Sequence, residues 1–302
     1  MESGLRVCVV GGINVDVVGT PSSPMIHGDS NPGRVHVSLG GVGRNIAENA
    51  ALLGMRVTML TALGEDTQTP WILADCEARG IRLDRACRVP EGRNCLYLSL
   101  NGVDGDLYAA VSDMGLCQAI TPAYLFGCLD ELRAADAVVA DCNLPPVSLR
   151  FLAEHCPGKL AVDPVSVKKA VRLQGLLQGL RLLKPNLPEA EVLTGVRGPE
   201  AAVEALRTAG VERVFVTLGA GGACWAGAEG MGTLPCVPGR IVDTNGCGDA
   251  FFAAALRAML EEADTREMAG AGLAAASLCA ETEGSVNREM TWERVQSRLR
   301  NS

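Results

Sequence analysis

The sequence has 302 residues, of which 48% are hydrophobic and 35 are glycine, so it can bury a large α/β core and is not a disordered chain. Its formal net charge is −8 and its pI is near 5.1, which argues against a general binder of nucleic acid or anionic membranes, because no basic field would offset phosphate repulsion. A small anionic ligand held by local amides remains compatible with this composition.

The N-terminal segment begins with a short apolar run over 5–10 that ends in two glycines, which predicts a buried strand leading into a sharp turn. Extended pieces over 13–19 and 34–38 follow, and the Pro/Ser/Gly/Asn segment between them predicts a hairpin. Asn14 and Asp16 alternate along the first of these strands, so both should face the same side. Two short polar groups side by side suit sugar hydroxyls, although turn formation is the alternative.

A glycine turn then leads into an amphipathic helix over 40–53. Gly40 and Gly41 permit a ligand to press against the backbone, and Asn45 offers a donor and an acceptor together. A turn and a helix cap would explain the same residues.

A second hairpin is predicted over 95–100 and 107–111, because Asn-Gly and Asp-Gly turn signals join the two apolar stretches. Two hairpins inserted into an α/β alternation predict a separate small sheet.

Beyond Thr121 the alternation of strands and helices becomes regular, with strands predicted over 137–140, 160–163, 180–184 and 214–218 and helices between them. This rhythm is typical of a parallel sheet covered on both faces, whose strand ends would align Asp141, Asp163, Asn186 and Thr217 along one edge.

Two of these strand ends carry polar motifs. Asn186 and Glu189 lie three residues apart at a strand-to-helix junction, where an amide and a carboxylate can hold a hydrated Mg²⁺. A good helix start would explain the same pair. Thr217 precedes a glycine turn that includes Gly219 and Gly222, which suits close approach by phosphates, and an ordinary hairpin turn is the alternative.

The most informative motif is Asp243-Thr-Asn-Gly-Cys-Gly-Asp249, which runs directly into an apolar helical stretch. Gly246 and Gly248 let the backbone bend, and unpaired N–H groups of the first helical turn would point at an oxyanion lodged there. Asp249 can take a proton from an alcohol while the amides stabilise charge on a transferring phosphoryl group. A helix cap is the alternative for Asp249, but the two glycines and the second carboxylate favour kinase chemistry.

The twelve cysteines include no Cys-x-x-Cys pair, so the spacing of a zinc site is missing. Several lie in apolar runs, which predicts small buried hydrophobes in a reducing compartment. No charged-then-apolar leader is expected, and the longest apolar stretch, from Ala250, is interrupted by Arg257 well short of a bilayer span. We therefore expect a cytoplasmic protein that binds neither nucleic acid nor a membrane.

The chain resembles the ribokinase-type sugar kinases, the PfkB family, over nearly its whole length. The resemblance rests on Gly40-Gly-Val-Gly-Arg-Asn45 and on the motif ending at Asp249. It implies an α/β fold with a ribokinase-like three-layer α/β/α core, a mainly parallel sheet and a small β-sheet lid. The single domain would span 1–302, with the lid formed by about 13–38 and 93–114 and inserted in a core of 5–12, 39–92 and 115–302.

The resemblance also implies ATP and Mg²⁺ as cofactors, with K⁺, and transfer of the γ-phosphoryl group to an alcohol of a sugar or nucleoside. Carried over by position, Asp249 is the catalytic base, and the anion hole is formed by Gly246, Cys247 and Gly248. The substrate would be held by Asn14, Asp16, Gly40, Gly41, Asn45 and the lid residue Asp113. ATP would meet Asn186, Thr217, Gly219 and Gly222, with Glu189 on Mg²⁺ through water and Asp243 and Asn245 on the monovalent cation.

Within the family, the segments 41–49 and 105–114 are most similar to pseudouridine kinases, which implies the 5′-hydroxyl of pseudouridine as the acceptor. Cys247 departs from the alanine usual in the family, and its bulk could slow transfer or make activity sensitive to oxidation. A kinase for ribose, adenosine or another nucleoside stays open, as does a non-catalytic nucleoside-binding regulator. A dinucleotide-dependent oxidoreductase would need Gly-x-Gly-x-x-Gly after the first strand, which the chain lacks. Exposed strand edges in the lid predict a homodimer.

Overall fold

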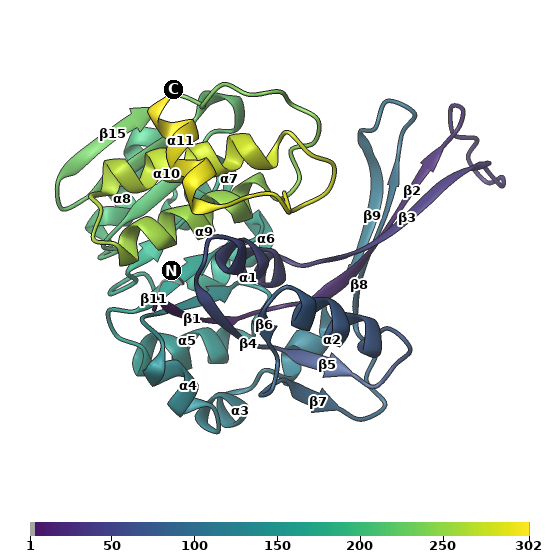
Figure 1. Cartoon of the computed structure of the whole chain (residues 1–302), viewed down its shortest axis with the longest axis horizontal. Helices are drawn as coiled ribbons and strands as arrows, with labels where there is room; N and C mark the ends of the chain where they lie inside the picture. Colours follow the sequence, from purple (N-terminus) through teal and green to yellow (C-terminus); the bar gives the residue numbers. More distant parts are fainter. Residues whose placement is uncertain (1–3, 302) are drawn as a thin grey trace.

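A nine-stranded sheet forms the centre of the computed structural model, which describes residues 4–301 (Figure 1). In spatial order its strands are β15 (Gly230–Leu234), β14 (Ala223–Gly227), β13 (Val214–Thr217), β12 (Leu182–Leu183), β11 (Leu160–Asp163), β10 (Ala137–Asp141), β1 (Arg6–Val10), β4 (Arg56–Leu60) and β6 (Ile81–Arg82). Neighbours from β13 to β6 pair in parallel, while β14 pairs antiparallel with both β13 and β15. The predicted mainly parallel sheet is confirmed.

Helices cover both faces of this sheet, as the regular alternation predicts. One apolar layer contains α1 (Val42–Leu52), α2 (Thr69–Ala78), α9 (Cys247–Leu260), α10 (Thr265–Cys279) and α11 (Trp292–Arg300). The opposite layer contains α3 (Pro122–Phe126), α4 (Leu129–Ala134), α5 (Pro146–His155), α7 (Leu187–Thr194) and α8 (Pro199–Thr208). The short helix α6 (Val167–Ala170) lies against α7. In β1, Val9 packs into the first layer and Val10 into the second. Because this strand is buried on both faces, its residues 7–10 are all apolar.

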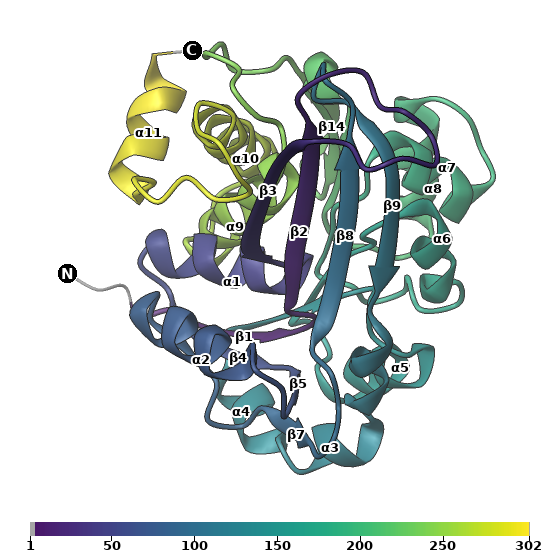
Figure 2. The ribbon, with the colours of Figure 1, turned by 90° about the vertical axis from the view of Figure 1, so that its right-hand side faces the viewer.

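The two predicted hairpins form one small sheet that projects from the core (Figures 1 and 2). Its strands, in spatial order, are β3 (Gly33–Gly40), β2 (Asn14–Pro21), β8 (Cys95–Asn101) and β9 (Leu107–Asp113). Each hairpin is antiparallel, and a parallel pairing of β2 with β8 joins the two. Every residue of β9 is exposed, whereas β2 begins with two buried residues and β8 has buried residues at Cys95 and Ser99. The small sheet is therefore packed mainly near its root.

Some local predictions needed the tertiary structure. Strand β12 covers two residues rather than the predicted 180–184, because an apolar run marks burial and not the extent of strand pairing. A two-stranded parallel sheet of β5 (Ala62–Gly64) and β7 (Cys87–Val89) was not predicted, and short 3₁₀ helices occur at η1 (Gly115–Ala119), η2 (Val171–Leu173) and η3 (Gly219–Gly221).

The cysteines are free thiols, and all except Cys87, Cys236 and Cys247 are buried, as predicted for small hydrophobes. Within residues 4–301, none of the helices has both the length and the apolar character needed to cross a membrane.

Candidate active site

The polar ends of the parallel strands lie along one edge of the large sheet, as predicted. Asp141 and Asp163 end β10 and β11 and face each other in register. On neighbouring segments, Asn186 forms an isolated bridge with Thr217. This carboxyl edge is the frame on which the remaining side chains meet.

Asp249 lies in the first turn of α9, which begins at the left-handed Gly246 (φ 73°) without a side-chain cap. The first helical hydrogen bond runs from Ala250 N to Gly246 O, so the amides of the preceding residues start outside the helical ladder. The Asp249 carboxylate is almost wholly buried, and it accepts a 3.0 Å hydrogen bond from Nδ2 of Asn45 in α1. Since this bond comes from a distant helix, the position of Asp249 is not explained by a local cap.

The glycines of this turn have a steric reason. A Cβ on Gly246 would lie 1.8 Å from the carbonyl oxygen of Ser285, so the loop after α10 closes directly over this residue. A Cβ on Gly248 would lie 3.1 Å from Nζ of Lys184, which brings an ammonium group next to the glycine turn. Backbone amides and a buried positive charge at one point form a site for an anion.

Lys184 is the main functional candidate that sequence reasoning missed. It follows β12, its side chain is almost fully buried, and its Nζ lies 3.0 Å from Oδ2 of Asp163. Burial acts to lower the pKa of Lys184, yet the Asp163 carboxylate and its hydrogen bond raise it overall, so the group stays charged. Its place in the sequence, directly after an apolar strand whose end lies at the carboxyl edge, could have marked Lys184 as a candidate site residue.

The acid–base character of Asp249 follows from its surroundings. Burial raises the pKa of Asp249 to about 8, and the nearby Asp163 carboxylate acts in the same direction. The Asn45 hydrogen bond and the Lys184 charge oppose this shift. A carboxyl group that titrates near neutral pH can accept a proton from an alcohol and later release it.

Asn186 and Glu189 cap the start of a helix, which is the structural alternative that the sequence left open for this pair. The Asn186 side chain accepts from Glu189 N at 2.9 Å, and Glu189 accepts from Asn186 N at 2.9 Å, which is a capping box at the start of α7. Burial, followed by repulsion from Asp163, raises the pKa of Glu189 to about 6. The cap therefore holds a buried carboxylate close to the other carboxylates of the edge.

The predicted sugar contacts converge at the root of the small sheet. Nδ2 of Asn14 donates to Oδ1 of Asp16 at 2.5 Å, so the two side chains share one face as predicted. A Cβ on Gly40 would lie 1.9 Å from Asp16 Oδ2, and one on Gly41 (φ 101°) would lie 2.9 Å from Asn14 Oδ1. Both glycines are therefore needed for close approach of polar side chains to the start of α1.

Asp113 does not join this group. The register pairs Asp113 with Leu96 and Leu96 with Val15, which places Asp113 on the opposite face of the small sheet from Asn14 and Asp16. Its side chain is exposed and accepts from Gly115 N at 3.2 Å. The same register pairs Asp16 with Tyr97 and Tyr97 with Ser112, so these three side chains lie on one face of the small sheet. Tyr97 and Ser112 could not be recognised as neighbours of Asp16 from the sequence, because strand pairing brings them together.

Of the residues predicted to contact ATP, one has open space beside it and another is packed against the protein backbone. Thr217 is half-buried at the end of β13 and donates its N–H to Pro185 O at 3.0 Å, and Gly219 (φ 57°) has open space around its Cα. Gly222 has a packing reason instead, because a Cβ there would lie 2.0 Å from Leu234 O.

The predicted monovalent-cation residues flank the start of α9. The two carboxylate oxygens of Asp243 accept from Asn245 N and Gly284 N, each at 3.0 Å. The carbonyl oxygens of Asn245 and Ser285 both face Sγ of Cys279, at 3.6 and 3.7 Å. The half-buried Cys247 also contacts Cys279, and a hydrogen bond between the two thiols lowers the pKa of Cys247.

A cavity of about 470 Å³ lies at the amino ends of β1, β4 and β6, among Arg6, Arg56 and Arg82. None of the predicted site residues lines it. The candidate active site is therefore identified by its buried carboxylates and ammonium group, and not by this cavity.

Residues 5–292 match the pfkB family carbohydrate kinases. The chain belongs to this family. A curated relative, the pseudouridine kinase of Escherichia coli (strain K12), is 34% identical to this pfkB-family kinase over 82% of the chain and 81% of that protein. Both the predicted family and the predicted similarity to pseudouridine kinase are thus confirmed.

Solved structures confirm the ribokinase-like fold of this pfkB-family kinase. Arabidopsis thaliana ribokinase complexed with ribose and ATP is similar with a TM-score of 0.86 and 24% identity, covering 99% of this chain and 100% of that one. An E. coli protein solved in complex with ATP and Mg²⁺ has a TM-score of 0.84 and 16% identity, covering 99% and 100%. Family and fold together identify the chain as a phosphotransferase.

Proposed function

We propose that this kinase transfers the γ-phosphoryl group of ATP to the 5′-hydroxyl of pseudouridine. The observation that carries the proposal is the buried Asp249 carboxylate at the uncapped start of α9, beside the Lys184 ammonium. The 34% identity to a pseudouridine kinase supports the choice of acceptor.

In the proposed reaction Asp249 accepts the proton of the 5′-hydroxyl as the new O–P bond forms and the bond between the γ-phosphorus and the bridging oxygen breaks. A pKa of about 8 suits this transfer, because the proton moves most readily between groups matched to the operating pH. The amides at Gly246, Cys247 and Gly248 and the ammonium of Lys184 stabilise negative charge on the migrating group. Asn45 holds the accepting oxygen of Asp249 in place.

The carboxyl edge is assigned to a divalent cation held through water, since within the described residues no group of three acidic, cysteine or histidine side chains is arranged to bind a metal ion directly. Asp163, Glu189 and Asp249 place three carboxyl groups around the single ammonium of Lys184, and their proximity contributes to the raised pKa values of Glu189 and Asp249. We assign Glu189 and Asn186 to hydrated Mg²⁺, which supplies positive charge to the phosphates when bound. The ATP contacts on this side are assigned to Thr217, Gly219 and Gly222.

The ribose side is assigned to the root of the small sheet. Asn14, Asp16, Gly40 and Gly41 lie together there, and short polar groups backed by glycines suit vicinal hydroxyls. In this proposal the small sheet acts as the lid, spanning about 13–38 and 93–114, and excludes water when it closes. Among the residues assigned to the substrate, the lid residue Asp113 has the least support, because it lies on the opposite face of the small sheet from Asp16.

Three further assignments complete the proposal. Asp243 and Asn245 belong to a K⁺ site, where the peptide oxygens of Asn245 and Ser285 gather near Cys279. The exposed apolar face of the small sheet makes the kinase a homodimer. A cytoplasmic location stays a prediction from composition.

A ribokinase-type activity is the second candidate, since the polar groups at Asn14 and Asp16 would recognise a ribose ring without identifying its base. The deciding experiment measures ATP consumption with pseudouridine, uridine, adenosine and ribose, each with and without Mg²⁺ and K⁺. We expect pseudouridine to give the highest kcat/KM and a 5′-phosphate product. A preference for ribose would replace the proposal with the second candidate, and no turnover with any acceptor would favour a non-catalytic regulator.

A further inference from the structure

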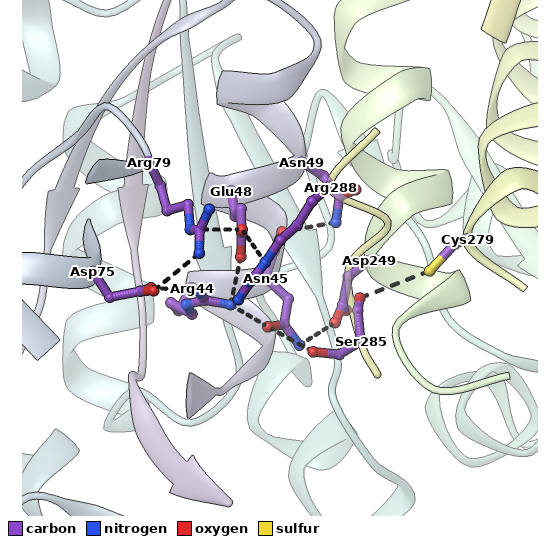
Figure 3. Close-up of polar contacts among 10 residues, drawn as sticks. All are labelled: Arg44, Asn45, Glu48, Asn49, Asp75, Arg79, Asp249, Cys279, Ser285 and Arg288. Carbon is purple, nitrogen blue, oxygen red and sulfur yellow. Dashed lines mark hydrogen bonds and ion pairs between the residues drawn. The ribbon is translucent and has the colours of Figure 1, made fainter. Parts of the chain in front are cut away.

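A group of four charged side chains, two of them buried and two partly buried, lies behind the site and is not used in the proposed reaction (Figure 3). We call it the Arg44 cluster, and it contains Arg44, Glu48, Asp75 and Arg79. Nη1 of Arg44 lies 2.6 Å from Glu48 Oε2, and its Nη2 lies 2.7 Å from Asp75 Oδ2. The Arg44 and Glu48 side chains are 3% and 1% exposed, so these charges are held without water.

The cluster reaches the proposed base through Asn45 (Figure 3). Nη1 of Arg44 donates to Oδ1 of Asn45 at 3.4 Å, and Oγ of Ser285 donates to the same oxygen at 3.3 Å. The other end of the amide, Nδ2, donates to Asp249 Oδ2 at 3.0 Å. Each end of the Asn45 amide therefore faces partners of one kind only.

This pattern determines which way the amide is turned. An amide rotated by half a turn would direct its NH₂ group at the Arg44 guanidinium, which can only donate, and its carbonyl oxygen at the ionised Asp249 carboxylate, which can only accept. Asn45 is 6% exposed, so water cannot satisfy the rotated arrangement. The donors on Oδ1 thus make the orientation that serves Asp249 the favourable one.

We propose that Arg44, held by Glu48 and Asp75, is a positioning residue that sets the orientation of the Asn45 amide so that Nδ2 donates to the base Asp249. This inference rests on the proposed function of Asp249. A planar guanidinium can donate to two carboxylates and an amide oxygen at once, which a lysine ammonium on a flexible stem would do less rigidly.

The inference has a measurable consequence for the pH profile. The Asn45 hydrogen bond stabilises the ionised form of Asp249, so its loss should raise the pKa of Asp249 further. The other groups that face Asp249 are Asp141, Asp163, Lys184 and the Cys279 thiol. The Arg44 cluster touches none of them directly, so its removal should act through Asn45.

The test compares wild type with the double variant Arg44→Met/Glu48→Gln. Removing Arg44 alone would leave the buried Glu48 carboxylate with only its longer contacts to Arg79, at 3.3 Å, and Arg288, at 3.9 Å. The double change removes both charges, and Arg79 keeps its partner Asp75. We expect kcat to fall about tenfold or more and the acid limb of the pH profile of kcat/KM to move to higher pH, with the KM for ATP unchanged.

The matched control is Arg79→Gln, which removes ion pairs of the same cluster but does not contact Asn45. It should lower the unfolding temperature without moving the acid limb. An unchanged limb in the double variant, or an equal shift in Arg79→Gln, would overturn the inference. Absence of turnover in the wild type would instead contradict the proposed function, so the two failures are distinct.

Should the double variant not fold, Arg44→Lys decides the question. It keeps a positive charge for Glu48 and Asp75 but gives up the Nη1 hydrogen bond to Asn45, so a smaller shift of the limb to higher pH is expected. Ser285→Ala removes the second donor to Oδ1 and should shift the limb in the same direction. Wild-type profiles in both variants would contradict a positioning role.

Discussion

The carboxyl edge of the large sheet and the small sheet differ sharply in how their residues are held. At the edge, Asp141, Asp163, Lys184 and Asp249 are all buried and have hydrogen-bond or ion-pair partners. In the small sheet, every residue of β9 is exposed, and most of β3 is as well. The root of β2, where Asn14 and Asp16 lie, is packed at the core.

In the proposed function, this difference separates the residues of the chemical step from those that recognise the substrate. Groups that must transfer a proton and stabilise charge need fixed positions in a water-excluded setting, which the packed edge provides. A sheet with few packed residues can instead move over a bound substrate, since local stability is low where buried contacts are few. Changes at the edge should therefore alter the chemical step, and changes on the small sheet should alter assembly or substrate capture.

The largest effect is expected at the edge, from Asp249→Asn. The amide cannot accept the proton of the hydroxyl, so kcat should fall by about 100-fold to 10,000-fold, while the dissociation constant of the nucleoside stays near that of the wild type. Steady-state kinetics and calorimetric titration measure the two quantities. The surface variant Asp136→Asn is the control, and an equal loss of binding and turnover would count against a base role.

The next effect is expected from Lys184→Met, which removes the ammonium beside Gly248 and leaves Asp163 unpaired. The folded state should lose about 3–5 kcal/mol, and kcat/KM should fall about 100-fold. Because Lys184 lowers the pKa of Asp249, the acid limb should also move to higher pH. Lys159→Met, which loses hydrogen bonds to the carbonyl oxygens of Arg133 and Ala135, should leave the limb in place.

The wild-type pH profile gives the third prediction. The base must be ionised, and burial raises the pKa of Asp249 to about 8, so kcat/KM should rise about tenfold per pH unit below that value and level off above it. The same raised pKa makes Asp249 favour the folded state at low pH, and this contribution is lost as pH rises through about 8. Rates measured from pH 5.5 to 9.5 test the first statement, and a profile flat across that range would contradict it.

A steric prediction concerns Gly246→Ala. The new Cβ would meet Ser285 O at a left-handed φ of 73°, so we expect the free energy of unfolding to fall by about 3 kcal/mol or more. Gly80→Ala has nearly the same φ, 70°, but open space around the Cα, so it should cost only about 1–2 kcal/mol. Denaturant unfolding compares the two, and equal losses would show that Ser285 does not close over α9.

The smallest effect on the chemical step is expected on the small sheet. By register, Val35, Val37, Leu98 and Val111 share one face, and each is exposed. The double variant Val35→Glu/Val111→Glu should place charges in the proposed dimer contact and shift the protein to a monomer in sedimentation, with kcat changed less than twofold. A dimer that persists would place the contact elsewhere.

Much of the fold could be predicted from sequence because its signals are local. The apolar run of β1, the turn signals around 101–106 and the glycines around Cys247 each act within a few residues, so their consequences could be inferred without knowing the rest of the chain. The ends of β10 and β11 could be aligned because parallel strands share one edge. The position of Asp113 could not be inferred, since a shift of one residue in strand pairing exchanges the faces of a sheet.

The amino-acid sequence by itself predicted the class of chemistry, because a glycine-rich helix start followed by a carboxylate is a local pattern that favours an anion site with its own base. Only the tertiary structure decided what tunes that carboxylate. Asn45 lies 204 residues from Asp249 in the chain, and Lys184 reaches Gly248 from another strand end. Spacing along the chain carries no information about such contacts, because they arise only when the sheet brings distant strand and helix ends to the same edge.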